Sequence, residues 1–266
     1  MLLSFTRALS PAFDRCQLTH LPRVPIDLDR ARAQHDAYEW TLVELGCTVR
    51  RIDSVPDLPD AVFIEDTAVI VREGAIVARP GAESRRAETP AVVAALARFG
   101  LPQHDITAPG TLDGGDVLVV GRRVFVGASA RTNVEGLDQI RRLLEPLGYA
   151  VRAVPVEGCL HLKSAVTAVA RDTLLLNRAW VPADAFPGLT TIDVDPDEPH
   201  GANALWLTGT GGPAGASDAV VYPAAFPKTR ARLERHGLRI RAVEVDELAK
   251  AEGGVTCCCL LVHISA

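Results

Sequence analysis

The chain has 266 residues, of which 48% are hydrophobic, and its formal net charge is −5. This length fits one large domain or two small ones, and the apolar content is ample for a sizeable core. The mild negative charge argues against a protein that coats nucleic acid and is compatible with a cationic small substrate. No apolar run is long enough to cross a membrane, and residues 1–9 lack the layout of a signal peptide.

The six cysteines have no spacing typical of a disulfide framework, and three of them are adjacent. We therefore expect reduced thiols and a cytoplasmic location. The cysteines are Cys16, Cys47, Cys159, Cys257, Cys258 and Cys259.

A first unit of helix and strands can be followed along the chain. Apolar residues fall on one helical face from Asp27 to Leu45, and Thr48 to Ile52 is typical of a strand. The next unit is predicted as strands Ala61 to Val71 and Ala75 to Arg79 around a Glu73-Gly74 turn, a helix from Thr89 (its expected N-cap) to Phe99, and a strand near Gln103 to Ile106.

The same order of elements then recurs. The next unit has strands Asp116 to Val120 and Val124 to Val126, helix Val134 to Leu147 and strand Ala150 to Val156. The unit after it has strands Ala165 to Ala170 and Thr173 to Leu176 and a short helix Pro182 to Phe186. The following unit has strands Ala204 to Leu207 and Ala219 to Tyr222 around a Gly-rich loop from Gly209 to Gly215, then helix Lys228 to His236 and strand Arg239 to Val245.

The last stretch, Val255 to Val262, is predicted as a buried hairpin that pairs near the N-terminus and closes a ring. About five units of roughly 50 residues indicate a radial array, in which the unit ends point into a central channel. An ordinary open α/β sheet is the alternative.

Acidic and basic residues gather where the hairpins begin. Asp60 precedes the predicted apolar strand, and Glu65 and Asp66 interrupt it. Buried carboxylates there require a cation, unless they cap a turn or pair with a core arginine. Arg85 follows a Pro-Gly turn and offers a fork for a carboxylate, although a solvated loop is the more usual reading of such a stretch. Arg131 lies in a polar insert that is also a helix N-cap signal.

Three residues in different units suggest one catalytic arrangement. Cys257 follows the Gly253-Gly254 hinge, His161 starts a hairpin between leucines, and Asp113 precedes paired glycines that let a side chain reach into a cleft. A lone histidine is more often a satisfied core residue. The coincidence of the three at hairpin starts favours a Cys-His-carboxylate arrangement.

Six stretches, in order, resemble the dimethylarginine dimethylaminohydrolases, a guanidine-modifying family of the pentein superfamily. They are Phe63-Ile64-Glu65-Asp66, Arg79-Pro80-Gly81-Ala82-Glu83-Ser84-Arg85-Arg86, Thr111-Leu112-Asp113-Gly114-Gly115-Asp116-Val117, Ala130-Arg131-Thr132-Asn133, Leu160-His161-Leu162-Lys163 and Gly253-Gly254-Val255-Thr256-Cys257. The resemblance runs from about Leu18 to the C-terminus. It implies a five-bladed α/β propeller of pseudo-fivefold ββαβ units around a central channel, as a single catalytic domain over residues 1–266.

The resemblance also implies roles for individual residues. Cys257 matches the nucleophile, His161 the general acid/base and Asp113 the carboxylate that orients the histidine. The substrate-binding residues that it implies are Glu65 and Asp66 for the guanidinium, Arg85 and Arg131 for the carboxylate, and Leu18, Asp60 and Ala251 around the amino-acid end. Ala251 departs from the larger aliphatic residue usual in relatives.

The implied activity is hydrolysis of free Nω-methylated arginines to citrulline plus dimethylamine or methylamine. The expected partner is this small molecule, with no nucleic acid and no membrane, and the expected state is a monomer or homodimer. We expect no cofactor. We also expect no required metal, because a structural zinc site needs four ligands and no Cys-x-x-Cys pair exists, although zinc is expected to inhibit through Cys257 and His161. Strand alternation predicts Cys257 and Cys259 on one face and Cys258 in the core. The segment Arg15 to Pro25 is a candidate lid.

Two other interpretations of the function remain open. The first is an arginine deiminase or a hydrolase of another substituted guanidine, which shares the nucleophile and the acids. The second is a non-catalytic binding protein on the same propeller fold, such as a ribosome-associated factor, which has no need for Cys257, His161, Asp113 and Asp66 together.

Overall fold

A computed structural model describes residues 1–208 and 218–264. The predicted Gly-rich loop from Gly209 to Gly215 lies outside the described residues. The strands, given sheet by sheet, are β15 (Leu260–His263), β1 (Leu2–Arg7) and β2 (Thr48–Ile52); β3 (Ala68–Val71), β4 (Gly74–Val77) and β5 (Gln103–Asp105); β6 (Val117–Val120), β7 (Arg123–Ala128) and β8 (Ala150–Pro155); β9 (Val166–Ala170), β10 (Thr173–Leu176) and β11 (Thr190–Asp193); and β12 (Leu205–Leu207), β13 (Ala219–Pro223) and β14 (Ile240–Val243).

Helices and single helical turns connect these strands. They are α1 (Leu28–Glu44), α2 (Thr89–Ala97), α3 (Val134–Leu144), α4 (Leu162–Ala165), α5 (Pro227–Arg235) and α6 (Asp246–Ala249), with 3-10 turns η1 (Phe13–Arg15), η2 (Ile64–Thr67), η3 (Glu83–Glu88), η4 (Gly114–Asp116), η5 (Glu145–Leu147) and η6 (Ala183–Ala185). Among the described residues, no helix has the length and apolar character needed to cross a membrane.

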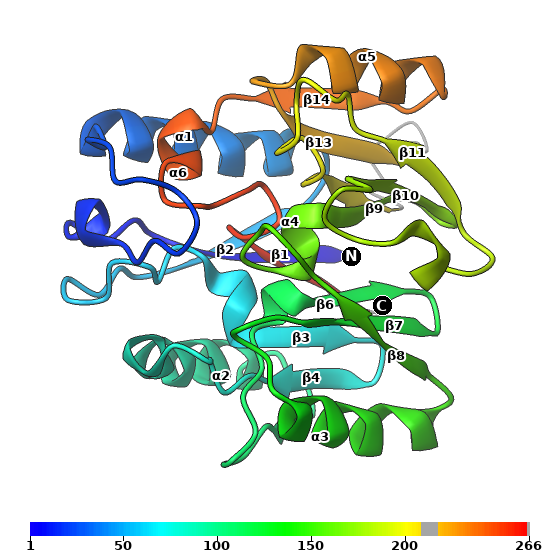
Figure 1. Ribbon diagram of the computed structural model, residues 1–266. Helices are drawn as coiled ribbons and strands as arrows, with labels where there is room; N and C mark the ends of the chain where they lie inside the picture. The colour runs from blue at the N-terminus through cyan, green and yellow to red at the C-terminus, as the bar shows by residue number, and fades with distance from the viewer. Residues whose placement is uncertain (209–217, 265–266) are drawn as a thin grey trace.

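The described strands form five three-stranded sheets of one topology. In each sheet two strands pair antiparallel, and a third, reached through the unit's helix or helical turn, runs parallel to the middle strand. Helices α1 and α5 lie above the strands in Figure 1 and α2 and α3 lie below them, so the helices cover the outside. The predicted five-unit α/β propeller is confirmed.

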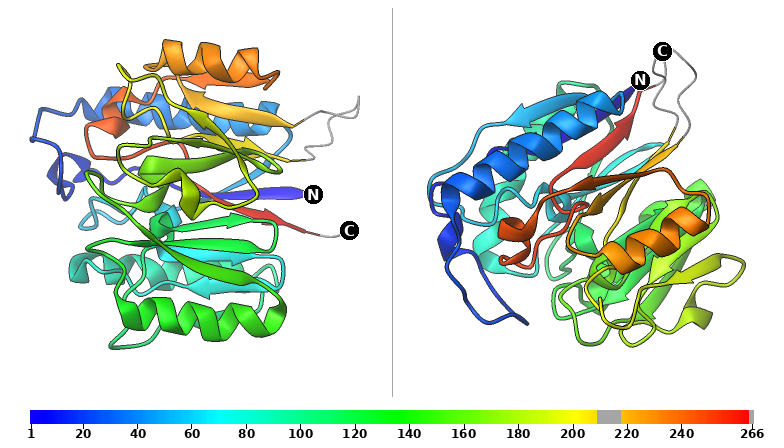
Figure 2. Two further views of the ribbon diagram at one scale, coloured as in Figure 1. Left: turned by 45° about the vertical axis from the view of Figure 1, so that its right-hand side comes forward. Right: turned by 90° about the horizontal axis from the view of Figure 1, so that it is seen from above.

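The ring closes where the two ends of the chain meet. Leu3 of β1 pairs with Val262 of β15 in an antiparallel register, as the sequence predicts. Figure 2 shows the first and last strands side by side. A cavity of about 220 Å³ lies between the first strands of the five sheets and is lined by Val69, Leu118, Ala168, Trp206 and Leu261, among others. This cavity corresponds to the predicted central channel.

Local sequence explains the longer helices. Asp27 caps α1 by accepting hydrogen bonds from the amides of Asp29 and Arg30, and Asn133 caps α3 through the amide of Gly136. Ile140 and Leu144 of α3 are buried against the strands, and each contributes about 1.5–3 kcal/mol of transfer free energy. Capping and one apolar face are therefore sufficient to predict these two helices.

Several predicted elements are wrong in detail. Residues 61–67 are not strand, because the chain turns at Phe63 and forms η2. Thr89 is not the N-cap of α2: η3 leads directly into the helix, and the Thr89 hydroxyl has no hydrogen-bond partner among the described residues. The expected hairpin Val255 to Val262 contains the single strand β15. Strand β11 and helix α6 were not predicted.

Candidate active site

Cys257 lies in a turn that precedes β15. The Cys257 amide donates to Gly254 O at 3.2 Å, and the Gly254 amide lies 3.2 Å from Cys257 Sγ. The Cys257 carbonyl accepts a hydrogen bond from the Glu65 amide at 3.1 Å, which attaches the turn to η2. Cys257 as a whole residue is only partly buried, so the turn leaves it more accessible than a position inside a buried strand.

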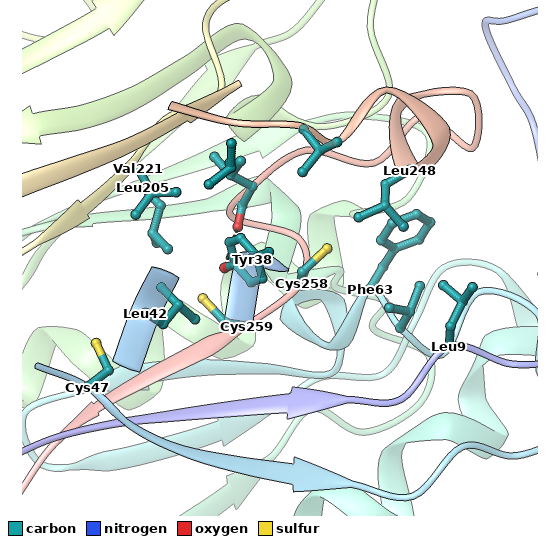
Figure 3. Close-up of a cluster of buried hydrophobic side chains, with 14 of the residues drawn as sticks. Leu9, Tyr38, Leu42, Cys47, Phe63, Leu205, Val221, Leu248, Cys258 and Cys259 are labelled. Carbon is teal, nitrogen blue, oxygen red and sulfur yellow. Dashed lines mark hydrogen bonds between the residues drawn. The ribbon is translucent and has the colours of Figure 1, made fainter. Parts of the chain in front are cut away.

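The cysteines that follow lie on the core side of this turn. Cys258 and Cys259 are both buried, in the cluster that contains Tyr38 and Leu42 (Figure 3). The predicted alternation, with Cys259 on the face of Cys257, is therefore wrong, because the extended strand begins only at Leu260.

His161 lies at the N-terminal end of α4, between two carboxylates. Its Nε2 is 2.9 Å from Asp113 Oδ2, and its Nδ1 is 3.8 Å from Asp66 Oδ1. Burial of the ring acts to lower its pKa, but Asp66 and the hydrogen bond to Asp113 outweigh this effect and raise the pKa of His161 to about 9. The imidazole is therefore protonated at neutral pH in this arrangement.

Asp113 and His161 are brought together by the loop that precedes β6. Asp113 Oδ1 accepts a hydrogen bond from the Gly81 amide at 2.8 Å, which fixes the carboxylate. A Cβ at Gly115 would lie 2.6 Å from Asp66 Oδ1 and 2.7 Å from His161 Nδ1. A glycine at position 115 therefore lets both side chains approach this backbone.

Glu65 and Asp66 are neighbours on η2 and have different partners. Asp66 accepts hydrogen bonds from Arg85 Nη1 at 2.5 Å and from the Gly115 amide at 2.9 Å. Burial acts to raise its pKa, but His161 and Arg85 hold the pKa of Asp66 down at about 2. Glu65 instead pairs with Lys163 Nζ at 2.5 Å, so only Asp66 is directed at the histidine.

The two predicted carboxylate-binding arginines differ in their surroundings. Arg85 is buried, and each of its guanidinium nitrogens donates to protein acceptors: Asp66, the two oxygens of Glu88, and the carbonyls of Asp60 and Phe63. Arg131 is partly exposed, and within the described part of the chain its guanidinium has one hydrogen bond, to Thr19 Oγ1 at 3.3 Å. Arg131 is thus the more accessible cation, and Arg85 also orients Asp66.

The remaining predicted site residues are those expected around the amino-acid end of a substrate. Asp60 is buried and accepts the Gln17 amide at 3.1 Å; burial raises its pKa although Arg85 opposes this. Leu18 is partly buried and packs on the hydrophobic cluster against which Cys257 also packs. Ala251 is buried just after α6.

Four further residues complete the site and were not predicted as part of it. Asn203 and Thr256 bond to each other beside Cys257, and Lys163 pairs with Glu65. Glu252 accepts hydrogen bonds from the amides of Thr19, His20 and Leu21. Thr256 and Lys163 belong to the quoted stretches but have no role there, and Asn203 immediately precedes the predicted strand Ala204 to Leu207.

The charges around the thiol disfavour its ionised form. Burial, together with Glu65 and Asp66, raises the pKa of the Cys257 thiol well above its usual value. A bound cation between Asp66 and the sulfur would oppose this effect. A cavity of about 270 Å³ opens beside Cys257 and has largely apolar walls, including Leu160 and Phe226.

Asp66, Asp113 and His161 lie close enough together to be considered as metal ligands. Their donor atoms are already engaged, however: Asp66 bonds Arg85, and Asp113 bonds His161 and the Gly81 amide. The adjacent arginine cation also opposes a metal ion. The donor chemistry therefore fits a protonated histidine and a cationic substrate better than a metal.

Known proteins that are similar to this chain share one description. Residues 23–264 match the sequence family described as N,N dimethylarginine dimethylhydrolase, eukaryotic. The chain is 40% identical to the N(G),N(G)-dimethylarginine dimethylaminohydrolase of Streptomyces coelicolor, over 96% of this chain and 94% of that protein. It is 34% identical to the Pseudomonas aeruginosa enzyme of the same name, over 87% and 88% of the two chains.

The fold matches solved structures of the same kind. A cysteine-to-serine mutant of the Pseudomonas aeruginosa enzyme, complexed with citrulline, superimposes with a TM-score of 0.88 at 31% identity, covering 97% of this chain and 98% of that one. An adduct of a dimethylarginine dimethylaminohydrolase histidine-to-glycine mutant with S-methyl-L-thiocitrulline also gives a TM-score of 0.88, over 98% of this chain. The chain therefore belongs to the dimethylarginine dimethylaminohydrolase family.

Proposed function

We propose that the protein hydrolyses free Nω-methylated arginines, asymmetric dimethylarginine and monomethylarginine, to citrulline and dimethylamine or methylamine. The observation that carries this proposal is the position of His161, 2.9 Å from Asp113 and 3.8 Å from Asp66, while the flanking residues Leu160 and Ser164 line the same cavity as Cys257. The family membership supports the same activity. The reaction needs no cofactor.

The proposed chemistry begins with recognition of the guanidinium by Asp66. The cation beside Cys257 lowers the pKa of the thiol, which loses its proton to solvent, and the thiolate attacks the central guanidinium carbon. His161, protonated at neutral pH because its pKa is about 9, donates its proton to the departing amine. A covalent thiouronium remains on Cys257.

The second half of the reaction regenerates the enzyme. His161, now neutral, takes a proton from a water molecule, and the resulting hydroxide attacks the thiouronium carbon. The carbon–sulfur bond breaks and the hydroxyl proton of the adduct passes to solvent, which releases citrulline and the Cys257 thiolate. Asp113 orients the imidazole through both steps by its hydrogen bond to Nε2.

The amino-acid end of the substrate supplies the remaining contacts. Arg131 and Arg85 bind the substrate carboxylate, while Asp60 and the backbone at Leu18 and Ala251 surround the amino group. Such a site accepts free arginines and excludes arginine within a protein. We further propose that residues 1–266 act as a single catalytic domain, monomeric or homodimeric, in the reducing cytoplasm, where the six free thiols are stable.

Amine release from asymmetric dimethylarginine, monomethylarginine and arginine tests this proposal. The expected products are dimethylamine and methylamine, with little ammonia from arginine, and Cys257→Ser is expected to abolish them all. Ammonia from arginine as the main product would instead indicate an arginine deiminase. Full turnover by Cys257→Ser would contradict covalent catalysis.

A further inference from the structure

Asn203 lies just before β12, outside every stretch with an assigned role. Its side chain is buried, with 7% of the residue exposed. Its Nδ2 donates to the Lys163 carbonyl at 3.0 Å and to Thr256 Oγ1 at 2.9 Å, and its Oδ1 accepts the Thr256 amide at 3.1 Å. One amide group thus contacts two separate segments of the site.

The two segments carry the two reacting groups. Lys163 belongs to α4, which starts immediately after His161, and Thr256 immediately precedes Cys257 in the turn. In sequence, these two segments are separated by more residues than one whole unit contains. Asn203 therefore joins the histidine-bearing segment to the cysteine-bearing turn by direct hydrogen bonds.

Glu65 closes this connection into a circuit. The Thr256 hydroxyl donates to Glu65 Oε2 at 2.8 Å, and Lys163 Nζ contacts Glu65 Oε1 at 2.5 Å. Since Nδ2 of Asn203 donates to the Thr256 oxygen, the hydroxyl proton is directed to Glu65. Each polar group in this buried circuit has a partner, which is the condition under which such a network makes a structure rigid.

The packing of Asn203 also supports the turn itself. A Cβ at Gly254 would lie 2.4 Å from Asn203 Oδ1, so the amide lies directly against the Gly254 backbone. Gly254 in turn holds Cys257 through the turn hydrogen bond and the contact with Sγ. The side chain of Asn203 therefore contacts both Gly254 and Thr256.

We propose that Asn203 is a positioning residue that fixes the Cys257 sulfur relative to His161. The inference rests on the proposed roles of Cys257 and His161 in the reaction. A displacement of about 1 Å at a reacting group can cost about 100-fold in rate. We expect Asn203 to affect kcat more than KM, because none of its hydrogen bonds goes to a residue proposed to bind the substrate's amino-acid end.

The variant Asn203→Asp tests this role, because it keeps the shape and removes both donors. A matched control is Asn177→Asp: Asn177 is equally buried, donates to the Pro199 carbonyl at 2.9 Å and accepts the Ala179 amide at 2.9 Å, with no side-chain bond to α4 or to the turn. Both variants lose a buried donor and gain a charge. We expect Asn203→Asp to lower kcat by about 100-fold with KM changed by less than about threefold, and Asn177→Asp to leave both near wild type.

A second readout is the rate at which a haloacetamidine alkylates Cys257, measured against pH. We expect Asn203→Asp to slow this reaction and to move its pH profile upward, whereas Asn177→Asp does not. Thr256→Val, which adds no charge, is expected to reproduce the loss of kcat, and Thr256→Ser to recover most of it. This pair keeps the proposal testable if Asn203→Asp does not fold.

Two results would overturn the inference: a folded Asn203→Asp with wild-type kcat and alkylation, or an equal loss in Asn177→Asp. Failure of the proposed function has a different signature. Wild-type protein alkylated at Cys257 but inactive on methylated arginines would contradict the substrate, while the effect of Asn203 on alkylation is read independently.

Discussion

His161 is buried, yet its surroundings favour the charged imidazolium over the neutral ring. Its pKa of about 9, against about 6.5 in an unfolded chain, means that the folded state binds the proton more tightly. This contribution to stability is complete below about pH 6.5 and is lost as the pH rises through about 9. The imidazolium therefore links catalysis and folding at one residue.

We expect the free energy of unfolding of the wild type to fall by on the order of 3 kcal/mol more than that of His161→Gln between about pH 6 and pH 10. Urea denaturation at a series of pH values measures this difference. Parallel curves for the two proteins would show that Asp66 and Asp113 do not hold the proton as the geometry indicates.

Arg85 and Arg131 lead to opposite expectations at the same scale. Lysine cannot replace the fork by which Arg85 joins Asp66 to Glu88. We expect Arg85→Lys to lower the free energy of unfolding by about 3–5 kcal/mol, because buried carboxylates lose a partner.

Arg131→Lys is expected to change the free energy of unfolding by less than about 0.5 kcal/mol and to raise KM with little change in kcat. Thermal unfolding and steady-state kinetics of both variants separate the two roles, and equal stability of the two variants would contradict them.

At the scale of single elements, the turn before β15 shows why the local sequence pattern predicted a strand there incorrectly. Residues Val255 to Cys259 are apolar or small and read as strand, but Tyr38 of α1 donates its hydroxyl proton to the Val255 carbonyl at 2.8 Å. That contact joins positions 217 residues apart, so no local window contains it. The glycines at 253 and 254 signal the bend correctly, whereas the partners that hold it are tertiary.

Glu252 is the element-scale feature that connects this turn with the candidate lid. It has φ +59, the one left-handed non-glycine backbone among the described residues, which stores local strain. Its carboxylate accepts the amides of Thr19, His20 and Leu21, the last two at 2.5 and 2.6 Å. Glu252 therefore holds the segment that carries Leu18 over the site.

We expect Glu252→Gln to speed amide hydrogen exchange at residues 19–21 by about 10-fold or more, because hydrogen bonds to a charged acceptor contribute about 1.5–3 kcal/mol. KM is expected to rise as the segment becomes less ordered. Hydrogen-exchange mass spectrometry measures the first effect, and the peptides of α1 serve as the internal control. Unchanged exchange at residues 19–21 would mean that other contacts hold this segment.

At the scale of the whole molecule, the repeat predicted the ring, because every unit has the same hairpin and parallel third strand. The repeat did not reveal the features that depend on strand pairing or on the packing of distant segments. Strand β11 is four residues long and is defined by its register with β10, such as Leu175 opposite Ile192. The link between Arg85 and Asp66 likewise forms only when η2 and η3 pack together. Motif order suggests the candidate site residues, but not which of them face each other.

The ring is closed by hydrogen bonds and not by the covalent chain, since the Met1 amine donates to the Ile264 carbonyl and the Ile264 amide donates to the Met1 carbonyl, both at 2.9 Å. The point where the chain begins is therefore arbitrary for this architecture. We expect a circular permutant of residues 1–266, with residues 266 and 1 joined by a short Gly/Ser linker and new ends between the exposed residues Arg171 and Asp172, to fold.

Its melting temperature should lie within about 5 °C of the wild type and its kcat within about threefold, because the opening lies in a hairpin turn where few contacts are lost. A permutant opened inside β10, between the buried residues Leu174 and Leu175, is the control and should not fold. Circular dichroism and amine release measure both proteins. If the first permutant also failed to fold, the continuous β9–β10 hairpin would be required to assemble the ring, and the five units would not be equivalent in folding.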